Sequence, residues 1–157
     1  MFIGHFAPAF VAASLGPRAP KLSTVFLAAQ LIDWAFFAFA IVGIEKMRIE
    51  PGATVMVPFD LYFYPYTHSL LGAALWALAF GLLVLVAQRN ALAALLSALV
   101  VLSHWVLDWV AHRHDLTLAG SEPYYGLGLW NYPEIAMPLE ITITLAGFIF
   151  YVRRTRG

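Results

Sequence analysis

The sequence predicts an all-α protein, a polytopic membrane bundle of four to five transmembrane helices in one domain covering residues 1–157. Of its 157 residues, 62% are hydrophobic and 11% are charged, and the mean hydropathy is +0.79. A soluble domain usually carries about 25% charged residues, so this chain lacks the charge to cover a water-exposed surface. Its long apolar stretches must be helical, because lipid offers the backbone no hydrogen-bond partner.

Five apolar segments are predicted as helices: residues 2–16, 22–44, 67–87, 91–111 and 134–152. The last four are long enough to cross a hydrocarbon layer of about 30 Å. The first is short for a full span, so a tilted, re-entrant or interfacial position stays open. It has no basic residues before its apolar run, and Pro8 interrupts that run. We therefore expect it to be retained and not cleaved as a signal peptide.

The polar connections predict how the helices are paired and oriented. Short turns at residues 16–20 and 88–90 alternate with longer loops at about 45–66 and 112–133, which favours two helical hairpins and a final helix. With five spans, one side receives only basic residues: Arg18, Lys21, Arg89, Arg153, Arg154 and Arg156. Positive charge marks the cytoplasmic side. We expect a bacterial inner (cytoplasmic) membrane protein with a cytoplasmic C-terminus.

Both long loops then face outward, and their aromatic residues are predicted to anchor the protein at the outer interface. These residues are Tyr62, Tyr64, Tyr66, Trp105, Trp109 and Trp130. The net charge of zero gives no electrostatic support for a nucleic-acid partner. The absence of cysteine excludes disulfides, thiolate metal ligands and cysteine nucleophiles.

Ionisable residues inside the apolar segments are the strongest functional signal. A charged group in hydrocarbon costs several kcal/mol, so it is normally paired, hydrated or functional. Six residues belong to this set: His5, Asp33, His68, His104, Asp108 and Glu140. At a rise of about 1.5 Å per residue, four of them fall roughly 20–22 Å from the cytoplasmic turns: His5, Asp33, His104 and Glu140. Asp108 falls one turn higher, and His68 at about 31 Å. These heights predict a polar pit that opens outward.

The fourth segment carries the most specific pattern, with His104 and Asp108 at i and i+4 on one helix face. An imidazole and a carboxylate one turn apart suit a divalent metal, Zn first and Mn or Fe as alternatives. A hydrogen bond that ties two helices together is the other interpretation. Thr67 is a candidate N-cap for the third helix. We expect His112, His114 and Asp115 to be solvated loop residues.

This order of motifs resembles the YdjM-type integral membrane metal-dependent hydrolases over about residues 5–133. The resemblance rests on His5, Asp33, Thr67-His68-Ser69, Ser103-His104 with Asp108, and the stretch from Gly126 to Trp130. It implies five metal ligands: His5, Asp33, His68, His104 and Asp108. It also implies a metal-activated water that attacks a phosphoester or similar bond. Where the family often has Asp-x-Asp, this chain has Asp33 alone. That difference implies a weaker or mononuclear site, or a relative that keeps only the fold.

Three functions remain open from the sequence. The first is a hydrolase of lipid or other membrane-proximal esters, with Glu140 as the catalytic residue that positions water and membrane lipid as the partner. The second is a non-catalytic accessory subunit of a larger complex, in which other membrane subunits are the partners. The third makes His68 or His104 an axial ligand of haem or chlorophyll, which leaves Asp33 and Asp108 unexplained. No inverted repeat supports transport.

Overall fold

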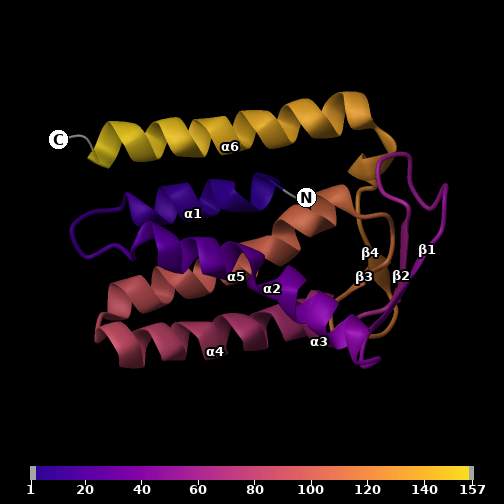
Figure 1. Cartoon of the computed structure of the whole chain (residues 1–157), viewed down its shortest axis with the longest axis horizontal. Helices are drawn as coiled ribbons and strands as arrows, with labels where there is room; N and C mark the ends of the chain where they lie inside the picture. The colour runs from indigo at the N-terminus through magenta and orange to yellow at the C-terminus, as the bar shows by residue number, and fades with distance from the viewer. Residues whose placement is uncertain (1–2, 156–157) are drawn as a thin grey trace.

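The computed structural model describes residues 3–155, so Phe2 and Arg156, which belong to the predicted first helix and basic cluster, lie outside it. The predicted helical bundle is confirmed. Four helices are long and apolar enough to cross a membrane: α2 (Leu22–Ile41), α4 (Leu70–Gln88), α5 (Ala91–Ala111) and α6 (Pro133–Thr155). The first segment is shorter, a 3-10 turn η1 (Ile3–His5) followed by α1 (Phe6–Ala13). Figure 1 shows the turn between α1 and α2, the turn between α4 and α5, and the C-terminus at one end of the bundle.

Small side chains let these helices approach closely. The central apolar cluster contains Ala9, Ala12, Ala28, Ala29, Ala73 and Ala77. Helices in lipid associate through such small residues, because lipid tails remove the hydrophobic drive for association. Helix α6 approaches α1 closely at Gly147, where a Cβ would lie 2.9 Å from the Ala7 carbonyl oxygen. Most of the large apolar residues outside this cluster are exposed, as expected for surfaces that face lipid.

The long loops contain short strands that the sequence analysis did not predict. Strand β1 (Lys46–Ile49) pairs antiparallel with β2 (Phe59–Phe63), and β3 (Leu116–Thr117) pairs with β4 (Tyr124–Tyr125). A second 3-10 turn, η2 (Leu129–Asn131), precedes α6. These elements gather at the end of the bundle opposite the C-terminus (Figure 1). The requirement for helix applies only to backbone in lipid, so loops beyond the ends of the helices are free to form hairpins.

The third predicted helix is broken in two. Helix α3 (Pro65–His68) ends at Ser69, whose extended backbone (ψ 153°) separates it from α4. Ser69 caps α4 by accepting a hydrogen bond from the Gly72 amide at 2.9 Å. The expected N-cap at Thr67 is therefore wrong, because the Thr67 hydroxyl donates instead to the Glu45 carboxylate.

Candidate metal centre

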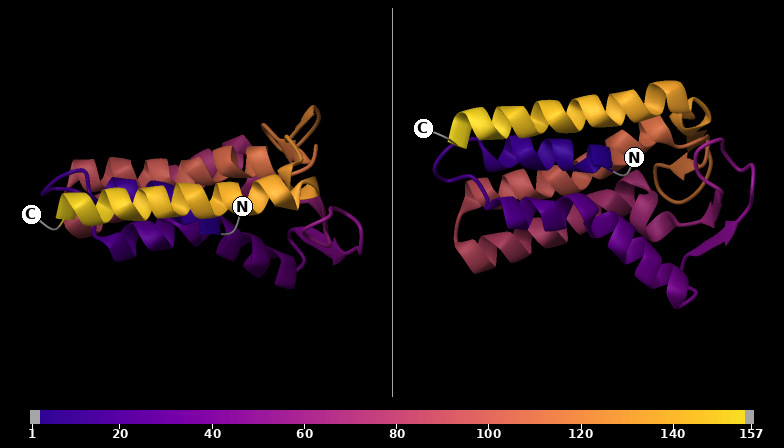
Figure 2. Two further views of the ribbon diagram at one scale, coloured as in Figure 1. Left: turned by 90° about the horizontal axis from the view of Figure 1, so that it is seen from above. Right: turned by 45° about the horizontal axis from the view of Figure 1, so that its top comes forward.

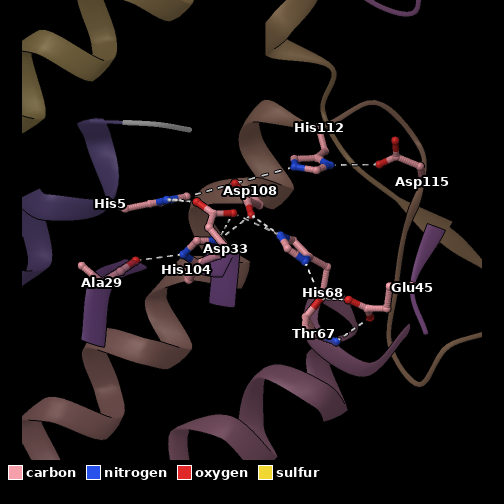
Figure 3. A network of polar contacts seen from close by, with 10 residues as sticks. All are labelled: His5, Ala29, Asp33, Glu45, Thr67, His68, His104, Asp108, His112 and Asp115. Carbon is pink, nitrogen blue, oxygen red and sulfur yellow. Dashed lines mark hydrogen bonds and ion pairs between the residues drawn. The ribbon is translucent and has the colours of Figure 1, made fainter. Parts of the chain in front are cut away.

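All five residues expected as metal ligands meet in the interior of the bundle (Figure 3). They arrive from four elements: His5 from η1, Asp33 from α2, His68 from α3, and His104 with Asp108 from α5. Their donor atoms form two groups, each with all atoms within 4.8 Å of one another. One group is His5, His104 and Asp108, and the other is Asp33, His68 and His104. His104 belongs to both groups and therefore marks the middle of the centre.

Two imidazoles and two carboxylates make the closest set of contacts. The Nε2 atom of His104 lies 3.1 Å from Asp108 Oδ2 and 3.4 Å from Asp33 Oδ1. The Nε2 atom of His68 lies 3.6 Å from each of the same two oxygens. Two ligands at a tetrahedral angle, each about 2.0–2.1 Å from one zinc ion, are about 3.3–3.4 Å apart. The spacing of these donors therefore fits a small divalent cation held between them.

The Nδ1 atoms of His104 and His68 point away from the centre, and their hydrogen bonds show which ring nitrogen carries the hydrogen. His104 Nδ1 lies 3.0 Å from the Ala29 carbonyl, which can only accept, so Nδ1 carries the hydrogen. His68 Nδ1 lies 2.8 Å from the Thr67 hydroxyl, whose own proton goes to Glu45 at 2.6 Å. His68 Nδ1 must therefore donate as well. In both rings Nε2 therefore faces the carboxylates, and in the neutral form of the ring this nitrogen carries the lone pair, as it does in metal-binding histidines whose other nitrogen donates a hydrogen bond.

A neutral imidazole nitrogen and a carboxylate repel each other through their lone pairs, and either a proton or a metal ion between them removes this repulsion. Here His104 Nε2 is buried and makes no hydrogen bond within the described part of the chain. Both carboxylates come from apolar helices, where a charged group needs partners. The donor set, its spacing and this buried nitrogen together fit a divalent metal.

His5 completes the cluster from the other side of Asp108. Its Nε2 atom is 3.2 Å from Asp108 Oδ1, and its Nδ1 atom is 3.8 Å from Asp33 Oδ2. The rings of His5 and His104 lie 3.8 Å apart, centroid to centroid. The two oxygens of Asp108 thus serve different imidazoles, Oδ2 those of His68 and His104 and Oδ1 that of His5.

His68 contacts the same carboxylates as His104, although it was expected nearer the outer end of the bundle. A continuous third helix would hold it roughly 9 Å above His104 and about 3 Å above Asp108. The structure instead brings its Nε2 atom to the same carboxylates as His104. The break at Ser69 explains the difference, because α3 is not a straight extension of α4.

His112 also lies at the site, which the sequence did not predict. It was expected in solvent, but only 2% of its surface is exposed. Its Nδ1 atom pairs with Asp115 Oδ1 at 3.2 Å, and its ring lies 4.3 Å from that of Trp130. Its Nε2 atom is 3.8 Å from Asp108 Oδ1. The i+4 spacing from Asp108 was the signal for this position. Asp115 is also largely covered, whereas His114 is exposed as expected.

Two residues assigned to an interfacial aromatic belt cover the centre instead. Tyr64 and Trp130 are buried, and the Tyr64 ring lies 5.2 Å from that of His68. Burial raises the pKa of the Tyr64 phenol well above its ordinary value, and the nearby Asp115 carboxylate adds to this shift. Tyr64 therefore remains a neutral hydrogen-bond donor at physiological pH. Tyr62 and Tyr66 are exposed, as expected of interfacial residues.

Glu45 was not identified from the sequence, although it is one of the most buried polar residues, at 1% exposure. Its carboxylate accepts hydrogen bonds from the Tyr66 amide (2.8 Å), the Thr67 amide (2.9 Å) and the Thr67 hydroxyl (2.6 Å). It thus holds the start of α3 and, through Thr67, the ring of His68. Glu45 lies in a loop 22 residues before Thr67, and no local sequence pattern predicts this contact.

Glu140 lies apart from the two groups of donor atoms. It is buried on α6, and its Oε2 atom accepts a hydrogen bond from the Gly4 amide at 3.4 Å. Gly4 precedes His5 in η1, so this contact helps to position the turn that carries His5. Its catalytic role stays a prediction.

Compared with known proteins, the chain shows no match to a family model, to a curated protein or to a solved structure.

Proposed function

We propose that this protein is a membrane-embedded metal-dependent hydrolase that resembles the YdjM type and acts on lipid or other phosphoester substrates. One observation carries the proposal: the Nε2 atoms of His68 and His104 face the carboxylates of Asp33 and Asp108 inside an apolar bundle. Two imidazoles and two carboxylates at this spacing suit Zn, with Mn or Fe as alternatives.

The ligands proposed are His68, His104, Asp33 and Asp108, with His5 beside the shared Asp108. When bound, the metal would supply a Lewis acid and lower the pKa of a coordinated water. The chain's own residues orient the ligands: Ala29 fixes the His104 ring, and Thr67 with Glu45 fixes the His68 ring. The apolar surroundings of these groups exclude bulk water, which strengthens their electrostatic interactions.

The cavity argues against the haem or chlorophyll alternative. About 40 Å³ is available beside His5, His68, Asp33 and Asp108. A few water molecules fit such a space, but a tetrapyrrole does not. In the accessory-subunit alternative the same His–Asp contacts would only link helices.

Chelation and metal return test the proposal directly. The protein in lipid vesicles is treated with a chelator, dialysed, and then given Zn²⁺, Mn²⁺ or Fe²⁺ while the hydrolysis of lipid and soluble phosphoesters is measured. We expect ester hydrolysis to be lost on chelation and restored by one of the metals, and Asp108→Asn to show neither effect. The proposal would be refuted if the chelator left the rate of hydrolysis unchanged, or if metal-loaded protein cleaved none of the esters.

The orientation proposed is that of a bacterial inner membrane protein with the metal centre near the outer side and the C-terminus in the cytoplasm. The basic residues at the turns and at the end of α6 support it.

A further inference from the structure

The cavity at the metal centre has two unlike walls. Four candidate ligands and His112 form the polar wall: His5, Asp33, His68, Asp108 and His112. The other wall is apolar, with Phe36, Phe37, Phe59, Leu61 and Trp130. A cavity of about 40 Å³ has room for water next to the carboxylates. A substrate that joins a polar reacting group to an apolar part fits a cavity lined in this way.

The mouth of this cavity lies beside α2. Only three of its lining residues are not buried: Asp33, Phe37 and Phe59. The Asp33 side chain is 22% exposed, whereas His5, His68, His104 and Asp108 are at most 4% exposed. The cavity therefore opens between α2 and the start of β2, and the pit expected to open along the bundle axis opens sideways. In Figure 2 (right), the outer half of α2 diverges from the neighbouring helices.

The mouth lies within the part of α2 that can span the membrane. Asp33 is eight residues before the end of α2 at Ile41, a distance of about 12 Å along the helix. The residues around it on α2 are large, apolar and exposed: Trp34, Phe37 (42%) and Ile41. Exposed apolar residues on a helix of this kind face lipid tails. The α2 side of the mouth therefore faces the bilayer, and its other side is formed by β2 at the level of the loops.

The aqueous side of the centre is closed by the outer loops. A separate polar pocket of about 270 Å³ lies there, lined among others by Asp60, Arg113 and Asp115. Buried Leu61 and Tyr64, together with His68 itself, stand between this pocket and the carboxylates. Arg113 bridges Asp60 of β2 and Asp115, which holds the two hairpins together over the centre. These side chains separate a water-soluble ester in this pocket from Asp33 and Asp108.

We propose that the substrate is a membrane lipid whose ester group reaches the centre sideways from the bilayer, between Phe37 and Phe59. This inference rests on the proposed hydrolase function and names its substrate class. The lipid chains would stay in the bilayer against the exposed face of α2 while the ester enters the cavity. Hydrolysis adds one water across the ester bond: the water oxygen bonds to the acid part, and the leaving alcohol takes a proton.

A photo-crosslinking lipid tests this route without relying on turnover. Metal-loaded protein is placed in vesicles of phosphatidylethanolamine and phosphatidylglycerol that contain a phospholipid with a diazirine beside its phosphate. After illumination, the labelled peptides are identified by mass spectrometry. We expect labelling around Phe37 and Phe59 and a several-fold loss of it in Phe37→Trp, which narrows the mouth. Phe148→Trp is the matched control, because Phe148 on α6 is similarly exposed (46%) and lies outside the cavity.

Other outcomes separate this inference from the proposed function. Equal labelling of these peptides in Phe37→Trp and the wild type would overturn lateral access, as would stronger labelling by a water-soluble diazirine phosphoester. Metal content is measured in the same samples, so a chain that binds no metal refutes the hydrolase while the labelling still reports on the mouth. Phe59→Trp narrows the opposite wall and replaces Phe37→Trp if that variant does not fold.

Discussion

His104 and Asp33 come from different helices, yet His104 Nε2 lies 3.4 Å from Asp33 Oδ1 in the interior of the bundle. The His104 ring is held from behind by the Ala29 carbonyl of the same helix that carries Asp33. Helices α2 and α5 are thus joined twice at one level, once through a backbone carbonyl and once across the proposed metal. This pairing makes His104 the residue on which the centre depends most.

Replacing His104 should remove the metal. His104→Ala deletes the nitrogen that both groups of donor atoms share, so we predict that bound metal falls from about one ion per chain to near zero. Elemental analysis of the purified protein measures this. His114→Ala is the control: His114 is exposed, so this variant should bind as much metal as the wild type. Equal metal content in the two variants would contradict the assignment.

The hydrogen-bond chain behind His68 should tune metal affinity. Thr67→Val removes the acceptor for His68 Nδ1 and the donor to Glu45. Loss of such an outer partner typically weakens metal binding about 10- to 100-fold. Competition with a chelator of known affinity measures the change. Thr67→Ser keeps the hydroxyl and should restore the affinity, whereas a purely steric role for Thr67 would leave the Ser variant as weak as the Val variant.

The contact between α1 and α6 should be sensitive to a single methyl group. In Gly147→Ala the new Cβ would lie 2.9 Å from the Ala7 carbonyl oxygen, so one helix must shift. We predict a loss of roughly 1–3 kcal/mol in the free energy of unfolding. Thermal unfolding in detergent measures this loss. Leu145→Ala, at an exposed position on the same helix, should cost much less. Matching losses would argue against close packing at Gly147.

The proposed orientation can be measured by labelling single introduced cysteines, because the chain itself contains none. Tyr124→Cys in the outer loops should react with a membrane-impermeant maleimide on intact cells. Leu15→Cys, at the opposite end of the bundle, should react only after the cells are opened. Both positions are exposed in the structure. The reverse labelling pattern would invert the topology.

Hydropathy and spacing were sufficient to predict the helices, because lipid permits one solution for a long apolar run. Hydropathy also identified six ionisable groups in apolar segments, and the family resemblance implied the five of them that meet at the centre, whereas Glu140 lies apart. The break at Ser69 was not predicted, because no periodicity in this apolar stretch signals it.

The residues that cover the candidate metal centre could not be predicted from hydropathy and spacing. Tyr64, His112 and Trp130 contact one another through loops whose folding depends on long-range pairing, such as that of β1 with β2. The contact of Glu45 with Thr67 joins a loop to a helix 22 residues later, and no local pattern encodes it. Polar residues in such loops are expected in solvent by default, which is why His112 was placed there.

X-ray absorption spectroscopy of the metal in the purified, membrane-embedded protein tests the central claim most directly. We predict a first shell of nitrogen and oxygen atoms at about 2.0–2.1 Å with the scattering pattern of at least two imidazoles, and loss of that pattern in His104→Ala. A preparation without stoichiometric metal, or a metal surrounded only by oxygen with no imidazole signal, would contradict the account.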